Sequence, residues 1–193
     1  MDRAQLLEQF ETLAERPEAV EKLRTLVLDL AVRGRLVPQA GKSEQNAAWQ
    51  NTYRELDEQV HSRKTIPLFE IPEQWHWWVL GAIAESCGQK KPDQRFTYVD
   101  VGAIDNVRGI ITSDVQVLRA DQAPSRAPKL VRSHSVIYST VRPYLRNIAV
   151  IEKEFDPPAI VSTAFAVLHP KPLLDARFLF HWLSRFKKTS LRK

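Results

Sequence analysis

The first third of the chain has apolar residues at the three- and four-residue spacing of amphipathic helices. This spacing predicts one helix over residues 3–14, a second that begins near Pro17, and a third over residues 44–63. Proline is favoured in the first turn of a helix, and Gly34 favours an end to the second helix just before it. We therefore expect an N-terminal helical region over residues 1–64.

Beyond residue 95 the chain consists of short apolar segments separated by turn residues. The segments are rich in Val, Ile, Thr, Phe and Tyr, which favours β-strands. The expected strands lie within residues 96–101, 109–111, 115–120, 135–141, 147–151, 159–163 and 165–170. Helical spacing returns near Asp175. The predicted fold class is α+β: N-terminal amphipathic helices, then a mixed, β-rich domain over residues 65–193 that closes with a C-terminal helix.

The connection between the two regions has proline and tryptophan as its main features. Residues 64–74 hold two prolines and few helix signals, so we interpret them as a linker. Tryptophans follow at positions 75, 77 and 78, and we expect them to anchor a core or a docking surface. Stacking on nucleic-acid bases is the alternative for these side chains. The stretch 80–86 is expected to form a short helix.

Charge divides the chain at the same place. Of the 193 residues, 44% are hydrophobic and 26% charged, as in ordinary globular proteins, and the formal net charge is +5. Residues 1–64 hold ten Lys and Arg against eleven Asp and Glu, whereas residues 65–193 hold eighteen against twelve. The basic excess therefore belongs to the β-rich domain, and it favours an acidic partner there.

The basic residues are most prominent in the stretch 124–151, which contains no Asp or Glu. Arginine, hydroxyl and amide side chains are the groups with which proteins hold phosphate oxygens and read base edges. A solvated basic strand edge is the alternative interpretation. From this stretch and the strand after it, the candidate DNA-binding residues are Arg126, Lys129, Arg132, Arg142, Arg146, Tyr144, Asn147, Ser125, Ser139, Thr140, Ser162 and Thr163.

The sequence lacks the motifs of a catalytic or metal-binding site. Cys87 is the single cysteine, which excludes an internal disulfide and a cysteine-based zinc site and favours a reducing, cytoplasmic setting. The histidines are scattered, and none pairs with another at metal-ligand spacing. Gly41-Lys42-Ser43 lacks the first glycine of a phosphate-binding loop.

The turn Asp156-Pro157-Pro158 has some likeness to the catalytic loop of amino-methyltransferases. That loop needs an aromatic residue next, and Ala159 stands there, so a turn between two strands is the better interpretation. No apolar run is long enough to span a membrane, and the N-terminus lacks the basic and apolar start of a signal peptide. We therefore expect a non-catalytic binding module with no membrane segment.

Several stretches resemble the specificity (S) subunit of type I restriction–modification enzymes. The stretch Lys22–Pro38, KLRTLVLDLAVRGRLVP, is similar to the N-terminal region of those subunits, and Trp77–Ile83, WWVLGAI, to the entry into a target recognition domain. The stretches Ala123–Ala127, Ser139–Val150 and Val161–Pro170 resemble the body of that domain.

The resemblance implies a non-catalytic subunit that binds double-stranded DNA and reads a split target with two recognition domains. It implies methyltransferase (M) subunits that bind S-adenosylmethionine, and restriction (R) subunits that use ATP and magnesium, with no cofactor in this chain. One recognition domain is present, so we expect an N-terminal half that reads one half of a bipartite target. The alternatives are a recognition module of another phage-defence or type IIG methyltransferase, and a protein-interaction module that binds no DNA.

The resemblance also divides the candidate residues by role. Blocks that recur among domains with different targets are expected to position DNA or to build the fold. Base readers are then expected in the less recognisable loops at 89–95, 105–111 and 121–125. The added candidates in these loops are Lys90, Lys91 and Arg108.

Overall fold

The structure is a computed structural model, and it describes residues 17–39, 67–172 and 174–185. These residues divide into two compact units, one of residues 17–39 with 67–77 and one of residues 78–185, which we call the β-rich domain. The helices expected over residues 3–14 and 44–63 lie outside the described residues, and so does the expected boundary at residue 64.

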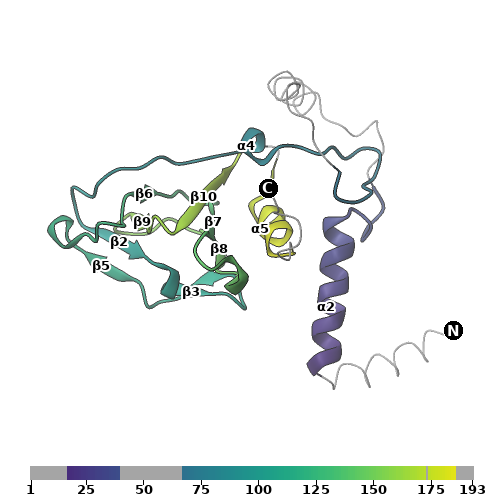
Figure 1. The fold of residues 1–193 in the computed structure, drawn as a ribbon, viewed down its shortest axis with the longest axis horizontal. Helices are drawn as coiled ribbons and strands as arrows, with labels where there is room; N and C mark the ends of the chain where they lie inside the picture. Colours follow the sequence, from purple (N-terminus) through teal and green to yellow (C-terminus); the bar gives the residue numbers. More distant parts are fainter. Residues whose placement is uncertain (1–16, 40–66, 173, 186–193) are drawn as a thin grey trace. The chain divides into compact units, whose positions relative to one another are not determined.

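The first unit is built on helix α2, Pro17–Val32 (Figure 1). As predicted, the helix ends before Gly34: its last residue is Val32, and Gly34 has a φ of 67°, in the left-handed region that glycine adopts without a steric penalty. The N–H of Arg35 donates to the carbonyl oxygen of Leu30 at 2.7 Å, which satisfies one of the carbonyls that a helix end leaves free.

The segment after Pro67 packs against this helix end instead of remaining an open linker. A Cβ atom added at Gly34 would lie 2.7 Å from Cγ of Pro72. The indole Nε1 of Trp75 donates to Oε1 of Gln39 at 2.8 Å, and the guanidinium of Arg33 lies 4.6 Å from the ring centroid of Phe69. Within this unit, the tryptophan therefore anchors local packing.

The β-rich domain contains two four-stranded sheets, a two-stranded hairpin and a closing helix. Its helices are α4 (Leu80–Ile83) and α5 (Ala176–Arg185), and its 3-10 helices are η2 (Val101–Ala103), η3 (Ala120–Gln122) and η4 (Pro143–Leu145). Its strands are β1 (Ala84–Glu85), β2 (Phe96–Val99), β3 (Ile104–Asp105), β4 (Ile110–Ile111), β5 (Gln116–Leu118), β6 (Lys129–Leu130), β7 (Val136–Ser139), β8 (Ile148–Val150), β9 (Ala159–Val161) and β10 (Phe165–Pro170).

The strand order is β1-β10-β7-β8 in one sheet and β5-β2-β9-β6 in the other, while β3 and β4 form the hairpin (Figure 1). All pairs are antiparallel except β2 with β9, where Val99 is opposite Val161. The predicted mixed fold and closing helix are confirmed. The turn predicted at 156–158 indeed lies between two strands, β8 and β9.

The expectation of a helix over residues 80–86 is only partly correct. Helix α4 stops at Ile83, and the chain then extends so that Ala84 pairs with Pro170 and Glu85 with His169. Hydrogen bonds to β10 replace the next helical turn, because pairing with a strand far along the chain overrides a weak local preference. The two-residue strands β3 and β6 were not predicted, since two residues are too few to show alternation.

The core of the β-rich domain lies between the strands of the two large sheets. Its most buried side chains include Val99, Ile137, Val161 and Phe165, which belong to β2, β7, β9 and β10. Helix α5 closes a second cluster, in which Leu179 packs with residues of β7 and β8. These clusters fix the strand ends, and the loops that follow the strands are therefore held at defined positions.

Candidate nucleic-acid interface

The turn between β7 and β8 projects two arginines from an unusual backbone. Arg142 and Arg146 lie immediately before and after η4, with φ of 52° and 53°. Residues other than glycine rarely adopt this left-handed backbone conformation, because their Cβ atom makes it unfavourable by about 1–2 kcal/mol per residue. The residue before a proline is also disfavoured in the ordinary helical region, which limits the choices open to Arg142 before Pro143. Strain of this kind is often found at binding sites.

The base of this turn is fixed by hydrogen bonds to the adjacent β9–β10 turn. The N–H and hydroxyl of Thr140 both donate to the carbonyl oxygen of Ala164, at 2.8 and 2.9 Å. The hydroxyl of Ser139 donates to the carbonyl oxygen of Val141 at 2.8 Å. The turn is therefore anchored on its β7 side, while Arg142 and Arg146 remain exposed.

The β3–β4 hairpin turn lies beside the β7–β8 turn and is joined to it. Nδ2 of Asn106 donates to the carbonyl oxygen of Leu145 at 2.9 Å. Within the hairpin turn, Oδ1 of Asp105 accepts from the N–H groups of Val107 and Arg108, each at 3.0 Å. Gly109 follows with φ of 68° and is backed by the ring of Phe180 from α5. The exposed Arg108 is therefore presented next to the two arginines of the β7–β8 turn.

Arg126 belongs to a third loop that meets the same end of the β2–β9 pair. Its carbonyl oxygen accepts from the N–H of Thr163 at 2.8 Å. Its guanidinium lies 3.6 Å from Oδ2 of Asp100, in a pair exposed to solvent. No ion pair joins Arg108, Arg142 or Arg146 to an acid within the described part of the chain. Among these four arginines of the described structure, Arg126 is therefore the one that is paired with an acid.

Tyr98 lies at the end of β2 beneath the Arg126–Asp100 pair. Burial raises the pKa of its phenol above the ordinary value of 10.0, so the group stays neutral at physiological pH. Its hydroxyl is buried near the side chains of Ser162 and Asp100 but forms no hydrogen bond of normal geometry within the described residues. Tyr98 therefore supports the site by packing rather than by charge.

Several sequence-predicted contacts are placed in the interior. Ser139, Asn147 and Ser162 are buried, and a side chain without solvent access cannot touch DNA in this conformation. The Ser162 hydroxyl instead accepts from the N–H of Ala164 at 3.3 Å, which shapes the β9–β10 turn. Nζ of Lys129 donates to the carbonyl oxygen of Phe165, which ties β6 to β10. The hydroxyl groups of Ser139 and Ser162 and the ammonium group of Lys129 therefore stabilise the strands and turns that present the exposed candidates.

No protein-family model matches the chain. Known proteins match it by sequence, and solved structures match it by fold. The type I restriction enzyme EcoAI specificity subunit of Escherichia coli is 24% identical over 204 residues, which cover 95% of this chain and 35% of the relative. The EcoEI specificity subunit of Escherichia coli is 40% identical over 80 residues, which cover 34% of this chain and 13% of the relative.

Solved structures agree with these relatives. The HsdS subunit from Thermoanaerobacter tengcongensis matches with a TM-score of 0.55 and 34% identity, over 64% of this chain and 35% of that one. A chain from a structure of the type I R-M system matches with a TM-score of 0.55 and 36% identity, over 60% and 30%. The chain is homologous to the specificity subunits of type I restriction enzymes.

The homology confirms the family resemblance predicted from the sequence. This chain spans about a third of the length of the EcoAI relative and of the two solved chains. Among the described residues no three His, Cys, Asp or Glu side chains meet as a metal-binding group. Within those residues no helix combines the length and the apolar character needed to cross a membrane.

The β-rich domain has a second group of basic residues, at the opposite end of the β2–β9 pair. Here a pocket of about 210 Å³ is lined by Phe96 and Pro158, at the starts of β2 and β9, and by Lys90, Lys91 and Arg132. Nζ of Lys90 lies 2.7 Å from Oδ2 of Asp93, and this ammonium lowers the pKa of the Asp93 carboxyl. The tertiary structure therefore separates the loop candidates Lys90 and Lys91 from Arg108.

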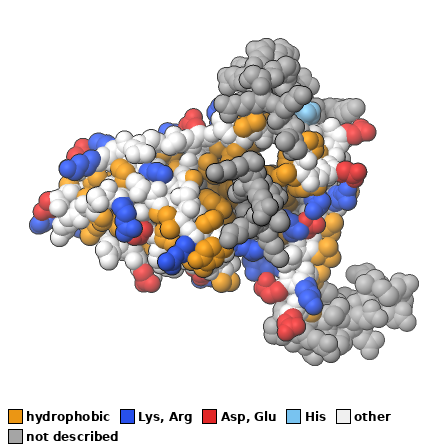
Figure 2. Space-filling view, viewed as in Figure 1, with side chains coloured by type: hydrophobic (Ala, Val, Ile, Leu, Met, Phe, Trp, Pro, Cys, Tyr) orange, Lys and Arg blue, Asp and Glu red, His pale blue; other side chains and the backbone are white. Residues whose placement is uncertain are grey.

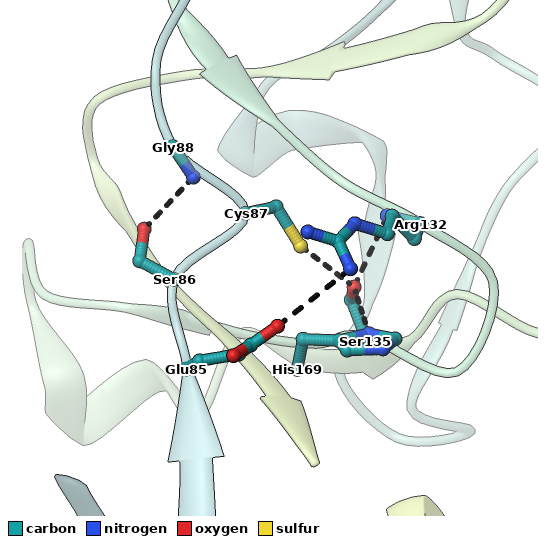
Figure 3. Close-up of polar contacts among 7 residues, drawn as sticks. All are labelled: Glu85, Ser86, Cys87, Gly88, Arg132, Ser135 and His169. Carbon is teal, nitrogen blue, oxygen red and sulfur yellow. Dashed lines mark hydrogen bonds and ion pairs between the residues drawn. The ribbon is translucent and has the colours of Figure 1, made fainter. Parts of the chain in front are cut away.

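Ser135 links three segments next to this pocket (Figure 3). Its Oγ lies 3.2 Å from Nδ1 of His169 and 3.6 Å from Sγ of Cys87, and it accepts from the N–H of Arg132 at 3.1 Å. The guanidinium of Arg132 pairs with Glu85 at 3.6 Å. A serine and a histidine in contact can suggest a nucleophile, but this hydroxyl is completely buried. The cluster is a structural tie among β1, β10 and the loop before β7.

Proposed function

We propose that this chain reads double-stranded DNA as part of a type I specificity subunit, and that its β-rich domain recognises one half of a bipartite target. The exposed arginines Arg108, Arg142 and Arg146 would reach the bases or the phosphates nearest to them. Arg126, Thr140 and Thr163 lie closer to the strand ends and would hold the backbone, where short donors and cations suit phosphate oxygens. Ser125 and Tyr144 are further exposed candidates on the loops of this end of the domain.

The observation that carries the proposal is the joined pair of turns. The Asn106–Leu145 hydrogen bond connects two exposed turns that present three arginines without acidic partners in the described structure. Arginine pairs with guanine or clamps phosphate in a two-pronged geometry, and a fixed backbone lowers the entropy lost on binding. The major groove admits a two-stranded ribbon, and we propose that the two joined turns enter it in a comparable way.

The assembly follows from the same proposal. This chain would contribute no catalytic group and would dock methyltransferase subunits, which bind S-adenosylmethionine, and restriction subunits, which use ATP and magnesium. Sequence reading and chemistry would then be divided between chains. The docking partners are inferred from the homology, whereas the DNA surface is inferred from the exposed arginines.

Binding of random-sequence duplexes should be weak and should fall steeply with salt. With roughly three to five phosphate contacts, raising salt from about 50 to 200 mM should weaken binding by roughly 40- to 500-fold, because each contact releases condensed counterions. Fluorescence anisotropy with a labelled duplex of random sequence would measure this slope. A protein-interaction module with incidental charge would bind no duplex, or would show no such slope, and either result would contradict the proposal.

Asp100→Asn should strengthen binding to random duplexes. The carboxylate lies 3.6 Å from the Arg126 guanidinium and would repel phosphate, whereas its Oδ1, which accepts from the N–H of Val101 at 2.8 Å, is preserved in Asn. An exposed ion pair is worth about 0–1 kcal/mol, so an increase of up to about fivefold in affinity is expected at low salt. The matched control is Glu152→Gln, which removes the carboxylate partner of Arg177, a residue of α5 outside the candidate loops. Equal effects of the two variants would remove Arg126 from the interface.

A further inference from the structure

The two joined turns expose apolar side chains as well as arginines. Val107 is 79% exposed in the β3–β4 turn, and Val141 and Leu145 are 55% and 42% exposed in the β7–β8 turn. Exposed apolar residues scattered singly are common, but a group on one surface usually marks an interaction site. The space-filling view shows hydrophobic and basic side chains together over the region of β3 and β8 (Figure 2). We call Val107, Val141 and Leu145 the apolar tip.

The backbone of the apolar tip is held in place. Asp105 accepts from the N–H of Val107 within the β3–β4 turn. Asn106 donates to the carbonyl oxygen of Leu145, so the two turns cannot separate without breaking this hydrogen bond. Val141 is fixed by its carbonyl oxygen, which accepts from the hydroxyl of Ser139. The tip therefore keeps its apolar side chains in solvent as a pre-organised surface, although burial of each would be favourable.

The flanking charges indicate the partner. Arg108, Arg142 and Arg146 are sequence neighbours of the tip residues and form no ion pair with an acid in the described structure. A complementary surface must be anionic around an apolar centre. Duplex DNA has this arrangement in its major groove, where the 5-methyl group of thymine lies between two phosphate backbones.

We propose that the apolar tip contacts thymine methyl groups in the major groove, so that Val107, Val141 and Leu145 specify T·A pairs in the target. This inference rests on the proposed function. Valine is short and branched at Cβ, which suits contact with a methyl group at a groove floor. Insertion between base steps in the minor groove is usually made by longer wedges, and that groove is too narrow for two turns.

The test uses the full chain and duplexes selected by the chain itself. A randomised duplex pool is enriched for binding, and each thymine of the resulting consensus is then replaced by deoxyuridine, which removes only the 5-methyl group. We expect at least one replacement to weaken binding by about fourfold, the value of one buried methyl group. The same replacement should have little effect on the Val107→Ala or Val141→Ala variant, because its protein contact has already been lost.

Val117→Ala is the matched control. Val117 is also an exposed valine of the β-rich domain, but it belongs to β5. This variant should keep the full response to deoxyuridine. A second comparison, Val107→Thr, keeps the side-chain volume and replaces a methyl with a hydroxyl, so it should lose part of the methyl response without a change in shape.

Each other outcome overturns the inference. A consensus without thymine, a neutral response at every thymine, or equal responses in Val107→Ala and Val117→Ala would show that the tip reads no methyl group. Failure of the proposed function is distinguishable: in that case the selection would enrich nothing and Arg142→Ala would leave duplex binding unchanged. If Arg142→Ala weakens binding while deoxyuridine has no effect, the DNA-binding proposal stands and the apolar tip has another role, such as contact with a protein.

Discussion

Replacing Arg142 with alanine is expected to weaken duplex binding by about 1–3 kcal/mol, or roughly 5- to 150-fold. The guanidinium is exposed on a left-handed residue before Pro143, and no acid of the described structure neutralises it. Alanine removes the hydrogen-bond donors and the charge. It also has a Cβ atom, so the energetic penalty of the left-handed backbone at this position stays the same. Folding should therefore change little, whereas the Kd for a duplex should rise, which anisotropy titration at moderate salt would measure.

Two further variants separate a specific contact from general charge. Arg142→Lys keeps the charge but loses the two-pronged geometry, so it should keep the salt slope while losing part of the affinity. Arg177→Ala removes an arginine of α5 that is paired with Glu152 at 2.9 Å, and it should bind as the unaltered chain does. An Arg142→Ala variant that binds like Arg177→Ala would exclude Arg142 from the interface.

Gly109→Ala should lower the free energy of unfolding by about 2–5 kcal/mol. Two penalties add: about 1–2 kcal/mol for a Cβ at φ of 68°, and about 1–3 kcal/mol because the new methyl group would overlap the ring of Phe180. Chemical denaturation would measure the loss. Because Gly109 ends the turn that contains Asn106 and Arg108, the variant should also weaken duplex binding.

Other glycines of the domain provide the controls for this prediction. Gly88 also has a positive φ, 84°, but an added Cβ would have no neighbour within 4 Å, so Gly88→Ala should show the conformational penalty alone. Gly102 has neither feature, and Gly102→Ala should be close to neutral. In the Gly109→Ala background, Phe180→Ala should cost less than it does alone, since it removes the overlap. If Gly109→Ala is no worse than Gly88→Ala, the ring does not constrain the turn.

The Arg142 and Gly109 predictions concern the same pair of joined turns. Arg142 tests what the joined turns bind, and Gly109 tests what holds one of them in place. Helix α5 supports the hairpin turn through Phe180, while the Asn106–Leu145 bond connects that turn to the arginines. Loss of either support should therefore affect recognition of a particular sequence more than it affects salt-dependent attraction to any duplex.

Local sequence patterns were sufficient for the longer elements and for the family resemblance. Residue preference and spacing account for the end of α2 before Gly34, the strands that contain Val99, Ile137 and Phe165, and the closing helix near Asp175. Both signals are short-range, because side-chain direction repeats every two residues in a strand and every 3.6 in a helix. The basic stretch 124–151 and the family resemblance could be read in the same way.

Only the tertiary structure decided which candidates share a surface. Strand pairing placed Lys90 and Lys91 at one end of the β2–β9 pair and Arg126 at the other, although all are loop residues of one basic domain. Burial took Ser139 and Ser162 into the interior, because their hydroxyls complete backbone hydrogen bonds there. A sequence pattern cannot report such outcomes, since they depend on hydrogen bonds between residues far apart along the chain.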